Sequence, residues 1–216
     1  MDPTPDLLDG LHPAWLRCLE LAWESWKEGS IPVGSVITDG AGRVVAEGRN
    51  RAFGEPDPEA PLAGTYVAHA EMNALARLAP GDYPEHTIWT SLEPCFMCSA
   101  AVFHSHAGTV RFAVSDPLMT GVSSLPETNA WVRTRWPARH GPLEGLAGDF
   151  AGLLHLLWHL QRKPDGVVVR AYLRAERRLV AAAERIAAAG TLNRTELSLP
   201  DALAAVSGDL AALQEP

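Results

Sequence analysis

The chain has 216 residues and a formal net charge of −8 at pH 7, with 47% hydrophobic and 20% charged residues. This composition is ordinary for a globular protein, and the length allows a hydrophobic core with room for an additional segment. The most apolar stretch, 153–160, contains two histidines and is too short to span a bilayer, so we expect no membrane segment. Three cysteines and an acidic N-terminus without an apolar core favour a reducing, cytoplasmic location.

The first half of the chain alternates between helical and strand patterns. Apolar residues at spacings of three and four predict a helix over 13–28. A loop over 53–64 carries Glu55, Asp57 and Glu59. The remaining predicted elements are strands over 33–37 and 44–47, a helix over 67–78, a strand over 86–92, a helix starting at 95 and a strand over 109–114. This alternation predicts an α/β sandwich with helices on both faces of a sheet.

The second half has a different character. Residues 117–142 are irregular and include Trp131 and Trp136, which either pack in the structure or form a lid that stacks on a planar base. Helices are predicted over 143–161, 167–189 and 200–214, and the second of these carries a basic stripe of four arginines, Arg170, Arg174, Arg177 and Arg178. We therefore divide the chain into a domain over 1–125 and a helical C-terminal extension over 126–216 that packs on it.

Two short motifs carry the chemistry. His69 and Glu71 lie in the first turn of one predicted helix, and Pro94 precedes Cys95 and Cys98 at the start of the next. One imidazole and two thiolates supply three ligands of a tetrahedral Zn²⁺ site, and a catalytic site keeps the fourth position for water. The cysteine pair alone also suits a redox motif or a structural zinc site. Neither alternative explains the carboxylate of Glu71.

The pattern H-x-E…P-C-x-x-C is the signature of zinc-dependent nucleobase deaminases. Zinc lowers the pKa of a bound water to about 7. We expect Glu71 to accept a proton from that water, to pass it to the ring nitrogen beside the target carbon, and to protonate the departing ammonia.

The chain resembles the cytidine and deoxycytidylate deaminase superfamily over roughly residues 12–121. It is most similar to the branch of tRNA adenosine deaminases, guanine deaminases and fungal-type cytosine deaminases. Five segments carry the resemblance: Pro32-Val33-Gly34-Ser35, Glu47-Gly48-Arg49-Asn50, His69-Ala70-Glu71, Ser91-Leu92-Glu93-Pro94-Cys95-Phe96-Met97-Cys98 and His104-Ser105. The resemblance implies a three-layer α/β/α sandwich of the cytidine deaminase type and a homodimer.

The resemblance also implies substrate contacts. Asn50 would hydrogen-bond the sugar or ring of the substrate, and the backbone around Ser91 and Leu92 would touch the leaving amino group. Without the resemblance, Asn50 is a turn residue after Gly48.

The zinc chemistry does not choose the substrate, because cytosine, adenine and guanine share the same N=C–NH2 unit. The negative net charge and the acidic loop favour a small nucleobase or nucleoside over nucleic acid, since phosphate contacts depend on Lys and Arg. The basic stripe keeps a tRNA adenosine-to-inosine deaminase as the alternative. A catalytically inert zinc-binding scaffold is an alternative of another class.

Overall fold

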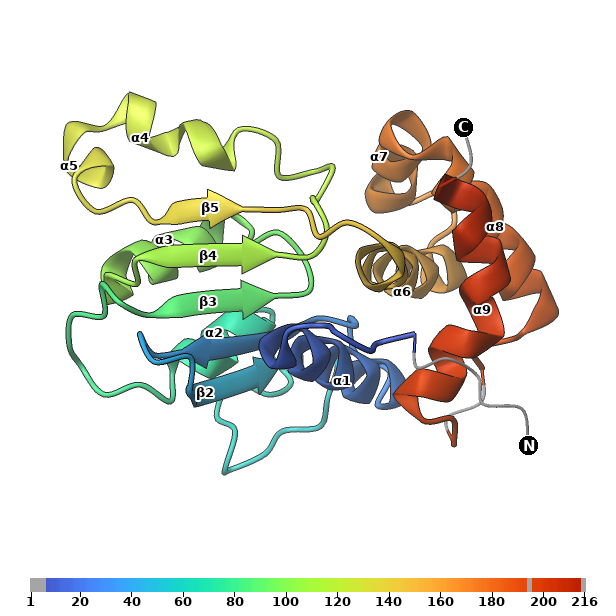
Figure 1. Ribbon diagram of the computed structural model, residues 1–216, viewed down its shortest axis with the longest axis horizontal. Helices are drawn as coiled ribbons and strands as arrows, with labels where there is room; N and C mark the ends of the chain where they lie inside the picture. Colours follow the sequence, from blue (N-terminus) through green and yellow to red (C-terminus); the bar gives the residue numbers. More distant parts are fainter. Residues whose placement is uncertain (1–6, 194–195, 215–216) are drawn as a thin grey trace.

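A five-stranded mixed sheet forms the centre of the computed structural model, which describes residues 7–193 and 196–214 (Figure 1). The strands lie in the order β2-β1-β3-β4-β5. Strand β1 is antiparallel to β2 and β3, whereas β3, β4 and β5 are parallel to one another. The bounds of the strands are β1 Gly34–Thr38, β2 Val44–Arg49, β3 Thr87–Thr90, β4 Thr109–Phe112 and β5 Ala138–His140. The sequence predicts the first four strands but misses β5.

Five helices agree with the sequence pattern within a few residues, whereas three short helices between residues 122 and 133 lie in a region expected to be irregular. Within the described residues, their bounds are α1 Pro13–Lys27, α2 Ala70–Leu75, α3 Phe96–Ser105, η1 Val122–Ser124, α4 Leu125–Thr128, α5 Ala130–Arg133, α6 Leu146–Arg162, α7 Val167–Ala175, α8 Arg177–Ala189 and α9 Leu199–Gln214. The single helix predicted over 167–189 is wrong. The backbone leaves the helical region at Glu176 (φ −138°, ψ 59°), and this break lets α8 turn to pack against α6 and α9.

Helices cover both faces of the sheet, as predicted. A Cβ atom on Gly34 of β1 would lie 2.2 Å from the Cys18 carbonyl oxygen of α1, and one on Gly48 of β2 would lie 2.4 Å from the Ala74 nitrogen of α2. Gly34 pairs with Arg49, the neighbour of Gly48, so the two glycines face opposite sides of the sheet. Only glycine allows these close contacts. The three-layer α/β/α sandwich is therefore confirmed.

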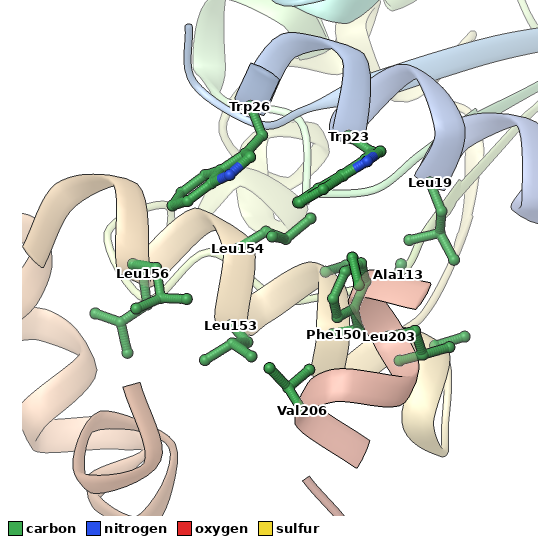
Figure 2. Packing of buried hydrophobic residues seen from close by; sticks show 14 of the residues in the cluster. Leu19, Trp23, Trp26, Ala113, Phe150, Leu153, Leu154, Leu156, Leu203 and Val206 are labelled. Atoms are coloured by element: carbon green, nitrogen blue, oxygen red, sulfur yellow. The ribbon is translucent and has the colours of Figure 1, made fainter. Parts of the chain in front are cut away.

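The C-terminal helices α6–α9 pack against α1 in one continuous hydrophobic cluster. Figure 2 shows Trp23 and Trp26 of α1 above the leucines of α6, with Leu203 of α9 on the same cluster. The two indole N–H groups also donate hydrogen bonds to carbonyl oxygens between α8 and α9: Trp23 to Leu197 at 2.9 Å and Trp26 to Leu192 at 3.1 Å. Apolar burial and satisfied indole groups together hold the extension on the sandwich.

The sheet extends beyond residue 125, where we expect the first domain to end, because β5 adds to the edge of β4. The division into two domains stays a prediction. Strands β3 and β4 point toward α6 in Figure 1, so the extension lies near their carboxyl ends. No helix within 7–193 and 196–214 has the length and apolar character needed to cross a membrane.

Candidate active site

His69, Cys95 and Cys98 come together at the start of two helices. The Nδ1 atom of His69 lies 3.6 Å from the sulfur of Cys95 and 3.4 Å from that of Cys98. Ligand bonds of about 2.3 Å to sulfur and 2.0–2.1 Å to nitrogen at tetrahedral angles put nitrogen and sulfur about 3.6 Å apart. The described chain offers this one group of three such ligand atoms within 4.8 Å of one another. The spacing and the donor types therefore fit a zinc ion.

The two motifs sit at matching places in the fold. His69 is the N-cap residue of α2 and Cys95 is the N-cap residue of α3, so Cys98 falls in the first turn of α3. Pro94 directly precedes the N-cap residue Cys95, outside the helix, where its missing N–H group costs no helical hydrogen bond. A hydrogen bond from the Cys98 backbone N–H, at the start of α3, favours the thiolate form of Cys95.

The protonation states of the three ligands depend on one another. A hydrogen bond from Cys98, helped by one from His69, lowers the pKa of the Cys95 thiol to about 4. The hydrogen bond with Cys95 and burial raise the pKa of Cys98, and the hydrogen bond with Cys95 raises that of His69. A bound cation would lower the pKa of Cys98 instead of raising it, because a thiol that coordinates a metal is deprotonated.

Glu71 stands beside these ligands but does not belong to the group. Its side chain is buried, with 3% of the residue exposed, and its Oε1 accepts a 3.0 Å hydrogen bond from the Thr90 hydroxyl. Burial raises the pKa of Glu71, and the nearby His69 partly opposes this shift. A carboxyl group with a raised pKa is suited to exchanging protons near neutral pH.

A cavity of about 160 Å³ joins these residues. His69, Glu71 and Cys95 line it together with residues that follow β2, β3 and β4, namely Asn50, Leu92, Glu93 and Asp116. A larger cavity of about 360 Å³, lined by Arg17 and Arg77 among others, contains none of the motif residues. The smaller cavity is the candidate site, because ligands of α/β sheets bind beyond the carboxyl ends of parallel strands.

Known proteins share this arrangement. Residues 12–114 match the family model of the cytidine and deoxycytidylate deaminase zinc-binding region. A tRNA-specific adenosine deaminase of Aquifex aeolicus is 31% identical over 134 residues, which cover 58% of this chain and 82% of that protein. This chain belongs to the cytidine and deoxycytidylate deaminase family.

Two further members of the deaminase family match over shorter regions. A tRNA-specific adenosine deaminase of Haemophilus influenzae is 37% identical over 102 residues, 45% of this chain and 54% of that protein. A cytosine deaminase of Candida albicans is 34% identical over 87 residues, 39% of this chain and 53% of that protein. The matched region thus spans about half the length of either relative.

Comparison with a solved structure confirms that this chain has the fold of the deaminase family. It comes from a study of A-to-I editing by tRNA:A34 deaminases and superposes with a TM-score of 0.52 at 22% identity, covering 64% of this chain and 97% of that chain. The deaminase-family match ends at residue 114, so α6–α9 lie outside it.

Asn50, an expected substrate contact of this deaminase-family chain, lines the cavity. Its Oδ1 accepts hydrogen bonds from the Ser30 hydroxyl at 2.9 Å and from the Ala52 N–H at 3.0 Å. The Ala52 N–H requires an acceptor, which fixes the amide orientation. The side-chain NH2 group is therefore the part of Asn50 left to donate to a ligand.

Ser91 and Leu92 differ in position. Leu92 lines the cavity, whereas Ser91 does not. The Ser91 N–H donates to the Gly34 carbonyl at 3.0 Å, and its hydroxyl accepts from the Gly34 N–H at 3.1 Å. Ser91 thus holds the end of β3 against β1. A substrate contact through its backbone stays a prediction.

Other expectations about the surroundings of the site need revision. Neither Trp131 nor Trp136 lines the cavity, so a lid that stacks these rings on a base has no support; Trp131 packs on Phe103 instead. The acidic loop also lies away from the cavity lining, and Asp57 pairs with Arg51 at 2.9 Å. The loop therefore gives little reason to exclude nucleic acid.

Sequence reasoning missed several residues of the site. Thr90 orients Glu71, and Arg139 of β5 forms a 2.9 Å ion pair with Glu93 in the loop before Cys95. His155 and His159 of α6 line the cavity from the extension. The signal for the last two was two histidines four residues apart within an otherwise apolar helix.

Proposed function

We propose that this protein is a zinc-dependent hydrolytic deaminase that replaces the exocyclic amino group of a small nucleobase or nucleoside with oxygen and releases ammonia. The observation that carries the proposal is the buried carboxyl of Glu71 in the same cavity as His69 and Cys95. A purely structural zinc site has no use for a buried carboxyl beside its ligands.

Glu71 moves the protons in this mechanism. It accepts one proton from the attacking water and delivers it to the ring nitrogen beside the reacting carbon. It then takes the second proton from the hydroxyl newly bonded to that carbon and gives it to the departing amino group as the C–N bond breaks. One water is consumed and one ammonia is released, so Glu71 ends in its starting state. The Thr90 hydroxyl holds Oε1 during these transfers.

The ligand set supports the same chemistry. His69, Cys95 and Cys98 would hold the metal, which when bound lowers the pKa of water to about 7 and so supplies a nucleophile near neutral pH. Asn50 would donate its NH2 group to the substrate from the cavity wall, because its oxygen is already engaged.

The size of the cavity supports a small substrate. Pockets for drug-sized ligands have volumes of roughly 300–1,000 Å³, and the cavity beside Glu71 has about 160 Å³. It therefore suits one heterocycle with any sugar near the opening. The net charge of −8 also disfavours a polyanionic partner.

A tRNA adenosine-to-inosine deaminase is the second candidate function. Two of the relatives described above carry the name tRNA-specific adenosine deaminase. Against it, the arginines expected to form one basic stripe are divided between α7 and α8 by the break at Glu176.

Ammonia release from a panel of bases and nucleosides tests the proposal. We expect the zinc-loaded protein to deaminate at least one free base or nucleoside and to bind tRNA weakly in a gel shift at physiological salt. Inosine formation in tRNA with tight binding would instead support the second function. A zinc-loaded protein that is inactive on every substrate would be an inert scaffold. The homodimer implied by the family stays a prediction, which light scattering tests.

A further inference from the structure

Helix α6 brings two histidines into the active-site cavity. His155 and His159 line it together with Val168 of α7. These residues follow the end of the family match at residue 114 by about 40 residues or more, so they are features of the extension. The two histidines are four residues apart and therefore lie on the same face of the helix.

His155 is fixed in place. It is buried, and its Nδ1 lies 3.0 Å from the hydroxyl oxygen of Tyr172 on α7, which is also buried. Its ring meets that of His159 edge to face, with ring centres 4.8 Å apart. His155 thus forms a rigid support behind His159.

The ring of His159 is held by packing but not by hydrogen bonds. It also meets the ring of Trp158 edge to face at 4.9 Å, and Trp158 is itself anchored by a hydrogen bond to the Gly29 carbonyl. Within residues 7–193 and 196–214, the His159 imidazole forms no hydrogen bond. It is half-buried and lines the cavity, so both ring nitrogens remain for a ligand.

The imidazole of His159 is neutral near pH 7. Burial, with a smaller effect from Arg162, lowers the pKa of His159 to about 4. A neutral imidazole has one N–H donor and one acceptor. Base edges of nucleobases likewise combine donors and acceptors, whereas a phosphate calls for a cation.

We propose that His159 is a specificity-determining residue that hydrogen-bonds the edge of the heterocyclic substrate. This inference rests on the proposed deaminase function and deepens it: the C-terminal extension, in addition to the family domain, selects the base. His155 and Tyr172 position the His159 ring.

The experiment compares four forms of the zinc-loaded protein: the parent, His159→Phe, His159→Gln and the control Gln161→Ala. Phenylalanine keeps a ring beside Trp158 and removes both nitrogens, whereas glutamine restores a donor and an acceptor. Gln161 is exposed on the same helix and does not line the cavity. For each form, kcat and KM are measured on cytosine, adenine, guanine and their nucleosides, together with zinc content.

We expect His159→Phe to lower kcat/KM for the best substrate by roughly 10- to 100-fold and to change the ranking of substrates, with zinc retained. His159→Gln should recover part of the loss, and Gln161→Ala should match the parent. If His159→Phe does not fold, His159→Leu takes its place. An active parent whose rates and ranking survive these changes overturns this inference alone. A parent that deaminates no base or nucleoside overturns the proposed function, and this inference with it.

Discussion

The hydroxyl group of Thr90 donates a 3.0 Å hydrogen bond to the carboxylate of Glu71, which is buried between the sheet and α2. Thr90 is the last residue of β3, and Glu71 lies in the first turn of α2. One hydrogen bond therefore joins the central sheet to the proton-transferring group, and its removal tests how strongly the sheet positions that group.

Replacing Thr90 with valine keeps the shape of the side chain and removes the donor. We expect the free energy of unfolding to fall by about 1–3 kcal/mol, because a buried carboxyl loses its partner. Turnover should fall by about tenfold, which corresponds to 1.4 kcal/mol in the activation barrier. Thr128→Val serves as the control, since the Thr128 hydroxyl bonds the Leu125 carbonyl on an exposed helix. Equal losses in the two variants would contradict this role.

The close contact at Gly48 predicts a different kind of defect. A Cβ atom there would lie 2.4 Å from the Ala74 nitrogen and 2.5 Å from the Ala70 carbonyl oxygen, so Gly48→Ala must push α2 away from the sheet. We expect a loss of about 1–3 kcal/mol in stability and weaker activity. Gly208→Ala on α9 meets no atom within 4 Å and should be neutral or stabilising. Urea unfolding of both variants checks this, and an unperturbed Gly48→Ala would refute the packing of α2.

Measuring the zinc content of cysteine variants distinguishes the cysteines assigned to the metal from Cys18. Cys98→Ser removes one of the three ligand atoms, and we expect elemental analysis to show a large loss of bound zinc and a lower melting temperature. Cys18→Ala is the matched control. Cys18 is fully buried against the sheet and outside the ligand group, so this variant should keep about one zinc ion per chain. Equal zinc in both variants would rule out the assigned ligands.

The buried histidine of α6 predicts a pH dependence of stability. Burial lowers the pKa of His155 to about 3, whereas an unfolded histidine titrates near 6.5. Between these values the unfolded chain binds more protons, so this residue lowers stability as the pH falls through 6.5, by up to about 1.4 kcal/mol per pH unit.

The raised pKa values of Glu71 and Asp116 act in the opposite direction, so the informative quantity is a difference between variants. We expect His155→Gln to lose less stability than the parent between pH 7 and pH 4. Parallel stability curves, measured by urea unfolding at each pH, would show that His155 is not buried in its neutral form.

The structure brings together the three residues that the sequence suggests as metal ligands, because local rules position them. His69 and Cys95 each occupy the N-cap position of a helix, and Cys98 follows Cys95 by less than one helical turn. Periodicity also predicts α1 and the first four strands. In contrast, β5 has only three residues, too few for a period to appear, and it becomes a strand through pairing with β4.

The part of the cavity wall that α6 supplies could not be predicted from the sequence. His155 and His159 are more than 80 residues away from Glu71 along the chain, and an apolar helix gives no sign of which element its polar residues will face. The break at Glu176 has the same origin: the local sequence favours a continuous helix, and the packing of α8 against α6 and α9 overrides it.

The most direct test of the whole account is the rate of ammonia release by Glu71→Gln. Glutamine fills the same space and still bonds Thr90 but exchanges no protons. With zinc content equal to that of the parent, we predict a loss of roughly 10²- to 10⁴-fold in kcat, while Glu127→Gln, at an exposed carboxylate of α4, should retain the parent rate. A Glu71→Gln protein that holds zinc and deaminates at the parent rate would contradict the assigned mechanism.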